Sequence, residues 1–452
     1  MRYVKLALIG AASAAVVIAL TFVAVRNREI PAITAGTPPN FDAALIKRGA
    51  DLAALGDCNT CHTTEGGKTF AGGRDIPTPF GTIYSTNITP DPDTGIGNWS
   101  EAAFQRAMRT GVDREGNYLY PAFPYDHFTL VSDNDNSALY AYLMTRTPVH
   151  APARPNDLSF PFNVRPLLAA WNVMFLHKGP FTPDPSQSEE WNRGAYLVES
   201  IGHCGACHTP RNWLGAEKTR QTFAGGDAEG WHAFTINAAS QAPIPWDADS
   251  LNAYLRQGWH GLHGVARGPM GPVVGNLATA SDQDVKAIAI YVASLMKQPA
   301  EQQRRDDNNL LVSSNNASGT GSKPQSAGSQ TTANAESPDD KGAVLYASAC
   351  ASCHDAGRPV PYGGINLALS TTVSSDDPRN ALRVILGGVP ATSGARGPIM
   401  PGFSDTLTDS QVIALAQYIR MRFAQKPAWT NVPEQLRKIR TEAQASTSST
   451  TR

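Results

Sequence analysis

The chain has 452 residues, enough for about three domains, and 41% of them are hydrophobic, which is sufficient for buried cores. A formal net charge of −1 excludes the basic surface that a nucleic-acid-binding protein needs. The 39 glycines and 33 prolines predict loop-rich domains with short elements, and the composition excludes a collagen-like or wholly disordered chain.

The N-terminus predicts a membrane anchor. Residues 6–25 form an apolar run of 20 residues without a charge, preceded by Arg2 and Lys5. At about 1.5 Å of rise per residue, this run matches one membrane-spanning helix. A cleaved signal peptide has a shorter apolar stretch that is followed by small residues. The sequence therefore favours an uncleaved transmembrane anchor over residues 1–28, with the rest of the chain exported.

All six cysteines lie in three Cys-x-x-Cys-His motifs. Cys58 and Cys204, and again Cys204 and Cys350, are 146 positions apart. A basic residue followed by Gly-Ala precedes each motif, at residues 48–50, 193–195 and 341–343. Ala-Gly-Gly follows the first two motifs, at residues 71–73 and 224–226. This regularity predicts a threefold internal repeat.

Two further helices recur in each repeat. The first is expected at residues 100–110, 247–257 and 378–386, closed by Gly111, Gly258 and Gly387, since glycine tolerates the left-handed turn at a helix end. The second begins after a Ser or Thr N-cap at Ser132, Ser281 and Thr408, and carries Tyr142, Tyr291 and Tyr418 at matching depth. The fold class predicted is all-α, with three copies of one small helical domain behind the anchor.

The predicted domains follow from these repeats and from the composition between them. They are an anchor (1–28), a first domain (42–150), a Pro-rich connecting strap (151–186), a second domain (187–300), a flexible linker (301–337), a third domain (338–428) and a polar tail (429–452). The strap is interpreted as packing across two domains, or else as a docking surface for a partner or a membrane. The linker is rich in Ser, Gly, Asn and Gln and has no aromatic residue, so it cannot form a core.

The motifs predict covalent attachment of c-type haem. Two cysteines three positions apart sit one helical turn apart and form thioether bonds to the two vinyl groups, while the adjacent histidine binds the iron. The alternatives are disulfides or zinc sites, but zinc needs four ligands and the pairs lie far apart in the chain. Three haem c groups are therefore expected, attached at Cys58, Cys61 and His62, at Cys204, Cys207 and His208, and at Cys350, Cys353 and His354.

The sixth iron ligands are predicted from position. Methionine is the usual partner of histidine in electron-carrying c haems. Met270 follows Gly258 by 12 positions and Met400 follows Gly387 by 13, both within Gly/Pro loops before the last helix. His260 and His263 are rivals of Met270 in the second domain.

The first domain departs from this pattern. Phe123 stands at the position equivalent to Met270, and phenylalanine cannot bind iron. The nearest donor in the same loop is His127, so bis-histidine ligation by His62 and His127 is predicted. A five-coordinate haem open to small ligands is the competing interpretation.

Longer sequence runs carry a family resemblance. They are Pro-Phe-Gly-Thr-Ile-Tyr-Ser-Thr-Asn-Ile-Thr-Pro-Asp at 79–91, Gly-Ile-Gly at 95–97, the loop at 119–125, and Gly-His-Cys-Gly-Ala-Cys-His-Thr-Pro-Arg-Asn at 202–212. With these runs, residues 42 to 425 resemble the multihaem cytochrome c subunits of bacterial membrane-bound dehydrogenases. The resemblance implies three class I cytochrome c folds that carry electrons from a periplasmic dehydrogenase to ubiquinone, on the periplasmic side of the inner membrane.

The resemblance also bears on the partner. Subunits of quinoprotein (PQQ) alcohol dehydrogenases and of flavin (FAD) sugar or gluconate dehydrogenases carry a methionine where this chain has Phe123. The Phe-Pro-Tyr-Asp-His version resembles subunits paired with molybdopterin hydroxylases, such as aldehyde dehydrogenases and nicotinate or isoquinoline oxidoreductases. It implies a molybdopterin catalytic subunit, with an aldehyde dehydrogenase favoured, and a small iron–sulfur subunit.

Other functional classes stay open. No arrangement of residues for substrate chemistry is found in the chain itself, so an electron-transfer subunit is predicted rather than an enzyme. A self-contained, peroxidase-like haem enzyme using an open first haem is one alternative. A free-standing shuttle to a terminal oxidase is another.

Overall fold

The computed structural model describes residues 27–33, 40–296, 338–355, 364–391 and 397–450. Contacts divide the chain into two compact units. The first consists of residues 1–188, 196–206 and 212–216, and the second of residues 189–195, 207–211 and 217–452. The three sequence repeats are called the first (42–150), second (187–300) and third (338–428) repeat below.

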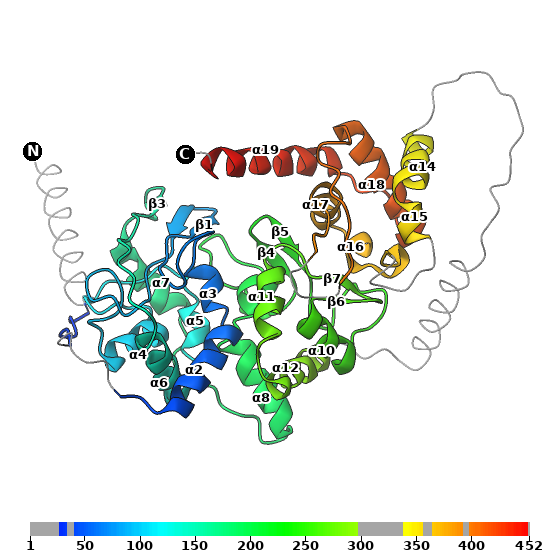
Figure 1. Ribbon diagram of the computed structural model, residues 1–452. Helices are drawn as coiled ribbons and strands as arrows, with labels where there is room; N and C mark the ends of the chain where they lie inside the picture. Colours follow the sequence, from blue (N-terminus) through cyan, green and yellow to red (C-terminus); the bar gives the residue numbers. More distant parts are fainter. Residues whose placement is uncertain (1–26, 34–39, 297–337, 356–363, 392–396, 451–452) are drawn as a thin grey trace, which may run out of the picture. The chain divides into compact units, whose positions relative to one another are not determined.

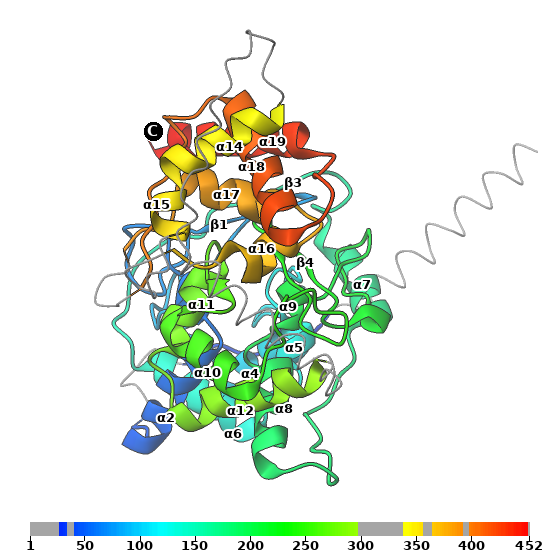
Figure 2. The same cartoon turned by 90° about the vertical axis from the view of Figure 1, so that its right-hand side faces the viewer.

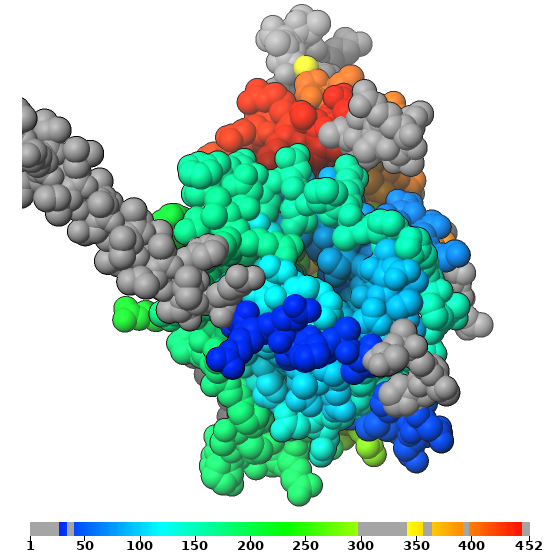
Figure 3. Space-filling model, turned by 90° about the vertical axis from the view of Figure 1, so that its left-hand side faces the viewer, coloured from blue at the N-terminus to red at the C-terminus, as the bar shows by residue number. Residues whose placement is uncertain are grey.

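The helices of the first repeat form the body of the first unit. Helix α2 begins after Asp42, whose side chain accepts hydrogen bonds from two backbone N–H groups, and α2 packs along α6 (Figure 1). Residues 27–33 lie on the surface of this repeat, with the Ile30 N–H donating to the Arg114 carbonyl (Figure 3). The helices are α2 (Ala43–Leu55), α3 (Cys58–Cys61), α4 (Glu101–Thr110), α5 (Tyr125–Phe128) and α6 (Asp133–Met144).

The strap belongs to the first unit and covers the loop before α5. It contains a short 3-10 turn, η1 (Arg165–Leu167), and helix α7 (Leu168–Phe175). The Asn172 side chain accepts from the Tyr125 hydroxyl at 2.7 Å and donates to the Thr110 carbonyl at 2.9 Å. The Trp171 ring packs against Tyr125, which is fully buried. The strap therefore holds the start of α5 in place.

The second and third repeats supply most of the second unit. In the third repeat α14 packs on α18, as the crossing in Figure 2 shows. In chain order the helices are α8 (Glu189–Glu199), α9 (Gly205–His208), η2 (Thr219–Gln221), α10 (Ala248–Gln257), α11 (Met270–Leu277), α12 (Asp282–Leu295), α14 (Pro338–Ala349), α15 (Ala351–His354), η3 (Leu367–Leu369), α16 (Thr371–Ser374), α17 (Arg379–Gly387), α18 (Asp409–Ala424) and α19 (Val432–Thr450).

A glycine in the first helix of each repeat permits a close helix crossing. A Cβ atom added to Gly49 would lie 2.0 Å from the Ala138 carbonyl oxygen, and one added to Gly194 would lie 2.0 Å from that of Ala287. The same atom on Gly342 would lie 2.5 Å from the Ala414 oxygen. The matching tyrosines of the last helices stand beside these glycines, with their Cβ atoms 2.6 to 2.8 Å from the added carbon. The recurring Gly-Ala thus marks the crossing point.

Local helix signals in the sequence are confirmed. Ser132, Ser281 and Thr408 cap α6, α12 and α18 by accepting from the backbone N–H three residues on. Helix α4 ends at Gly111 and α10 at Gly258, both with positive φ. The third helix differs, because α17 includes Gly387 and the positive φ falls on Gly388.

The all-α fold class with an N-terminal transmembrane anchor is wrong. Small antiparallel sheets accompany the helices, and each strand is only two to four residues long, too short for a visible alternation. They are β1 (Asp75–Thr78), β2 (Gly81–Tyr84) and β3 (Asp157–Leu158) in the first unit, and the pairs β4 (Gly226–Ala228) with β5 (Trp231–Ala233) and β6 (Trp259–His260) with β7 (Gly264–Val265) in the second.

The predicted membrane anchor has no support in the described part of the chain. Within the described residues, no helix combines the length and the apolar composition needed to cross a bilayer. The predicted span, residues 6–25, lies outside the described part of the chain.

Residues 429–452, predicted as a polar tail, contain helix α19. Its buried residues recur every three or four positions, which is the spacing of one helix face. Val432, Leu436 and Ile439 join the core of the third repeat, together with Trp429 just before the helix. The Arg420 guanidinium packs over the Trp429 ring and donates to the Val373 carbonyl, so this segment is part of the domain.

Candidate haem sites

The three Cys-x-x-Cys-His motifs adopt a similar local structure. Cys58 opens helix α3, and the N–H of His62 donates to the Cys58 carbonyl at 3.0 Å. In the third repeat the N–H of His354 donates to the Cys350 carbonyl at 3.0 Å. One turn of helix therefore separates the first cysteine of each motif from its histidine, as haem attachment requires.

The histidine of every motif has its Nδ1 hydrogen-bonded to a backbone carbonyl. The acceptors are Thr86 for His62 at 2.7 Å, Phe234 for His208 at 2.6 Å and Ile365 for His354 at 2.8 Å. A carbonyl only accepts, so Nδ1 carries the proton in each ring. Iron would therefore bind through Nε2, with the carbonyl fixing the orientation of the imidazole.

The small sheets and the Ala-Gly-Gly motifs position the first two of these carbonyls. Thr86 follows β2 by two residues, and Phe234 directly follows β5. Gly72 donates to the His62 carbonyl at 2.8 Å, and Gly225 donates to the His208 carbonyl at 2.8 Å. The repeated glycines thus close the loop after the motif, and the hairpin returns the chain to the histidine ring.

The protonation states suit haem attachment better than zinc binding. Burial lowers the pKa of His62 and of His208, and so favours the neutral imidazole that binds a metal. Burial raises the pKa of the Cys58 thiol to about 12, whereas a zinc site needs thiolates. All six cysteines lie in the described part of the chain and none is in a disulfide. No group of three converging His, Cys, Asp or Glu side chains in that part includes a cysteine.

The structure describes both predicted methionine ligands, but only part of the loop that carries Met400. Met270 is half-buried and is the first residue of α11. Met400 is half-buried and exchanges two backbone hydrogen bonds with Val389, at 2.8 and 2.9 Å. Residues 392–396 of the second loop lie outside the described residues. Both methionines stay predictions as iron ligands.

The rival histidines of the second repeat pack beside Trp246. The His263 ring stacks on the indole with 3.5 Å between ring centres, and only 6% of the residue is exposed. Burial lowers the pKa of His263 to about 3, which keeps the ring neutral. His260 accepts from the Leu262 N–H through Nδ1.

Phe123 belongs to an aromatic cluster under the strap. It packs with Tyr125 and Trp171 in one apolar core cluster of the first unit. The phenylalanine at the methionine-equivalent position therefore serves packing, and its ring offers iron no donor atom.

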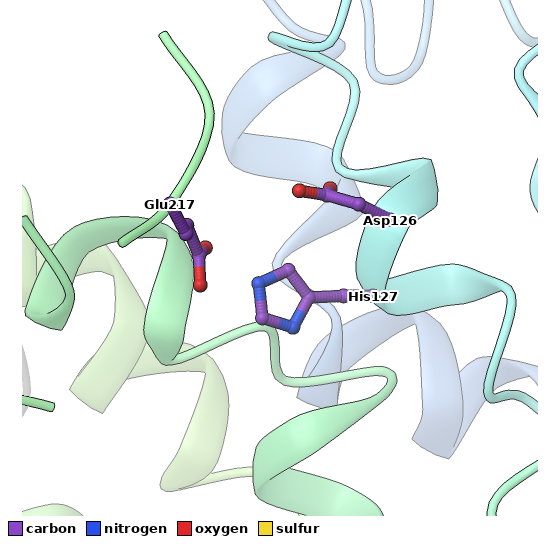
Figure 4. A group of neighbouring side chains, drawn as sticks. All are labelled: Asp126, His127 and Glu217. Carbon is purple, nitrogen blue, oxygen red and sulfur yellow. The ribbon is translucent and has the colours of Figure 1, made fainter. Parts of the chain in front are cut away.

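His127 stands on α5, with Asp126 beside it (Figure 4). Its Nδ1 lies 2.7 Å from the carbonyl oxygen of Glu199, near the end of α8. This is the arrangement of the three motif histidines, so a metal at this ring would bind through Nε2. Met108 and Met144, which carry the sulfur atoms of the two helices that flank this loop, are buried in the core.

The residues present fit haem c in a further respect. Among the described residues of the second repeat, three buried polar side-chain atoms have no hydrogen-bond partner: Asn252 Oδ1, His263 Nδ1 and Arg267 Nε. Buried polar atoms are normally paired. An arginine of this kind, three residues before Met270, suits a buried anionic group such as a haem propionate. The sequence alone did not single out Arg267.

The helical repeats and their histidine geometry define a c-type cytochrome. Residues 337–419, in the third repeat, match the family described as cytochrome C oxidase, cbb3-type, subunit III. The chain is 35% identical over 407 residues to the fructose dehydrogenase cytochrome subunit of Gluconobacter japonicus, covering 87% of this chain and 82% of that protein. It is 37% identical over 404 residues to the gluconate 2-dehydrogenase cytochrome c subunit of Pantoea cypripedii, covering 83% and 85%.

The chain therefore belongs to the family of cytochrome c subunits of dehydrogenases, and the predicted resemblance is confirmed. Such a subunit transfers electrons on covalently bound haem c and leaves substrate oxidation to its dehydrogenase. The chain is also 47% identical over 411 residues to a nicotinate dehydrogenase subunit of Pseudomonas putida, covering 89% of this chain. The match spans only 33% of that longer protein.

Proposed function

We propose that this chain is a triheme cytochrome c that passes electrons from a molybdopterin dehydrogenase to ubiquinone on the periplasmic side of the inner membrane. The observation that carries the count of three is the shared histidine geometry: Nδ1 of His62, His208 and His354 each faces a backbone carbonyl. When bound, haem iron supplies one-electron transfer. The chain's own residues hold the iron-binding nitrogens in place, and burial keeps the His62 and His208 rings neutral by lowering their pKa values.

The haem count has a direct test. The haem content of the purified chain, measured as its pyridine haemochrome and as intact mass, is expected to be three per chain. Replacing both cysteines of one motif with alanine, for example Cys58 and Cys61, is expected to lower the count to two. The corresponding pairs in the other two motifs are the matched variants. A count of three in any of these double variants would contradict the assignment of that motif.

His127 is the proposed sixth ligand of the first haem, with Met270 and Met400 serving the second and third. The Glu199 carbonyl supports this assignment, because it orients His127 as the motif histidines are oriented. His127→Met is expected to change the low-spin spectrum of one haem and to raise its reduction potential. His150→Gln, at a side chain that is 63% exposed, is the control and leaves the spectrum unchanged. A wild-type spectrum in His127→Met would overturn bis-histidine ligation.

The molybdopterin partner is supported by two features. The chain shares 47% identity with the nicotinate dehydrogenase subunit, against 35% and 37% with the fructose and gluconate dehydrogenase cytochrome subunits. The loop also carries Phe123 and His127 in place of a methionine. An aldehyde or an N-heteroaromatic acid is the class of substrate that such a partner oxidises, and a small iron–sulfur subunit completes the complex.

Exposed apolar side chains of the strap suit an apolar partner such as a quinone-bearing membrane or the dehydrogenase. Val173 is 86% exposed and Phe160 is 81% exposed, with Leu167 and Met174 on the same segment at 54% each. Large apolar side chains exposed together mark interaction surfaces. This supports electron delivery at a membrane surface.

Purification of the native complex tests the partner. Mass spectrometry and a metal assay are expected to find a large molybdenum-containing subunit and a small iron–sulfur protein in stoichiometric amounts. A quinoprotein or flavoprotein instead would move the chain to the alcohol or sugar branch of the family. Quinone reduction by the purified complex, with an aldehyde and then nicotinate as reductant, separates the two substrate classes. A chain that purifies alone would contradict the proposal and favour a shuttle.

A further inference from the structure

We infer that His203 is a positioning residue that links the first and second haem-attachment motifs and forms the bridge for electron transfer between them. The inference rests on the proposed presence of haem at both motifs. His203 directly precedes Cys204 of the second motif, and its ring lies in the first unit against the segment that leads to Cys58.

The bridge is one hydrogen bond. Nε2 of His203 lies 3.2 Å from the carbonyl oxygen of Gly56. Since the carbonyl only accepts, Nε2 carries the proton and donates. Gly56 is two residues before Cys58, so a path of covalent bonds and a single hydrogen bond connects the two attachment cysteines. Electron tunnelling is faster along bonded and hydrogen-bonded paths than across gaps between side chains.

The ring of His203 is held from a second side. It meets the buried Phe128 ring edge to face, with 5.6 Å between ring centres and 79° between planes. Phe128 follows His127, the proposed sixth ligand of the first haem. His203 therefore contacts both the attachment segment and the ligand helix of the first repeat.

Neighbouring contacts also hold residues 196–203 of the second repeat against the first repeat. The His127 ring is 2.7 Å from the Glu199 carbonyl, and the Tyr196 hydroxyl donates to Asp135 at 2.7 Å. An added Cβ on Gly56 would lie 3.1 Å from the Ile201 side chain, so the backbones approach closely there. The spacing between Cys58 and Cys204 is thus fixed on both sides of His203.

The backbone conformation of His203 is shared by the residue before the first motif. The φ of His203, 36°, lies in the left-handed region, which is strained for a residue with a Cβ. Glycine would adopt this conformation without the penalty. Asp57, which directly precedes Cys58, has φ 53°, so this turn is a feature of the motif, and glycine can replace His203 without added backbone strain.

The test measures electron equilibration between haems in the full-length holoprotein after flash reduction, without substrate or partner. His203→Gly removes the ring contacts with Gly56 and Phe128 and relieves the backbone strain. It is expected to slow equilibration between the first and second haems at least several-fold, while the three reduction potentials stay at their wild-type values. His203→Asn, which tolerates the same backbone but has a shorter side chain, is the second variant and is expected to slow it as well.

The control is Gln425→Gly, an exposed residue at φ 52° after α18, far along the chain from the two motifs. It is expected to leave the rate unchanged. An unchanged rate in both His203 variants, a similar slowing in Gln425→Gly, or a change of rate explained by shifted potentials would each overturn the inference. Failure of the proposed function is separate, since a missing haem would appear in the haem count before any rate is measured, and a missing dehydrogenase would leave this rate unaffected.

Discussion

Gly49→Ala is expected to destabilise the first repeat. The added Cβ would lie 2.0 Å from the Ala138 carbonyl oxygen and 2.6 Å from Cβ of Tyr142, whereas ordinary contact is about 3.5 Å. Both neighbours are backbone or backbone-proximal atoms, so no side-chain rotation relieves the overlap. Helix α2 must therefore move away from α6.

The magnitude follows from two opposed terms. Overpacking of a close contact costs about 1–3 kcal/mol, with severe overlap at the upper end. Alanine recovers up to about 1 kcal/mol of helix propensity relative to glycine. A net loss of about 2 kcal/mol is expected, which is roughly a thirtyfold change in the folding equilibrium.

Hydrogen exchange of the amides in α2 and α6 is the assay, because it reports the stability of this repeat alone. The matched control is Gly275→Ala in α11, where nothing lies within 4 Å of the added Cβ, and a gain of up to about 1 kcal/mol is expected there. Since Cys58 follows α2, haem attachment at the first motif should also fall in Gly49→Ala. Protection in α2 equal to wild type would refute the close-crossing argument.

Three further predictions concern polar contacts. Asp135→Asn removes the charge that Arg48 contacts at 3.0 Å, and it is expected to lower the free energy of unfolding by about 1–3 kcal/mol in chemical denaturation. The control is Asp133→Asn, at a carboxylate that is 80% exposed, which should change the free energy of unfolding by less than about 0.5 kcal/mol. The Asn380 side-chain amide accepts from the His232 N–H at 3.0 Å and donates to the His232 carbonyl at 2.8 Å. Asn380→Leu removes both hydrogen bonds and should raise the hydrogen-exchange rate of the His232 amide. An unchanged rate would contradict this pairing. Asp247 is the N-cap of α10, and the hydrogen bond from the Ser250 N–H lowers the pKa of its carboxyl group. The carboxylate therefore stabilises the helix fully at pH values above the pKa of Asp in the unfolded chain, about 3.9. This stabilisation is lost as the pH falls through the lower pKa of Asp247 in the folded protein. Asp247→Ala should therefore cost about 1 kcal/mol in thermal denaturation at neutral pH and less in acid, and a pH-independent cost would refute the linkage.

The parts of the fold that sequence could predict are those written in neighbouring residues. The N-caps Ser132, Ser281 and Thr408 act on N–H groups three residues away, so their role is visible in a short window. The strands escape prediction because segments such as Trp259–His260 are too short to show a period. The wrong all-α class follows from that.

The candidate haem sites also contain one part that the sequence shows and one part that it does not. The cysteines and histidines of the motifs are side-chain chemistry at fixed spacing, and the sequence shows them directly. The carbonyls of Thr86, Phe234 and Ile365 are backbone atoms that any residue supplies, so no residue type marks them. The contact of His203 with Gly56 joins positions 147 apart, a distance at which a single sequence gives no signal.

The close helix crossing at Gly49, Gly194 and Gly342 allows the rest of each repeat to vary. The crossing of the first and last helices is the same in all three repeats, whereas the loop between them carries Phe123 and His127 in one, Met270 in another and Met400 in the third. Because the helix crossing is constant and the loop varies, each proposed iron environment can change without rebuilding the core. Grafting residues 259–270 between Gly111 and the start of α6 is accordingly a way to give the first repeat the proposed ligand loop of the second.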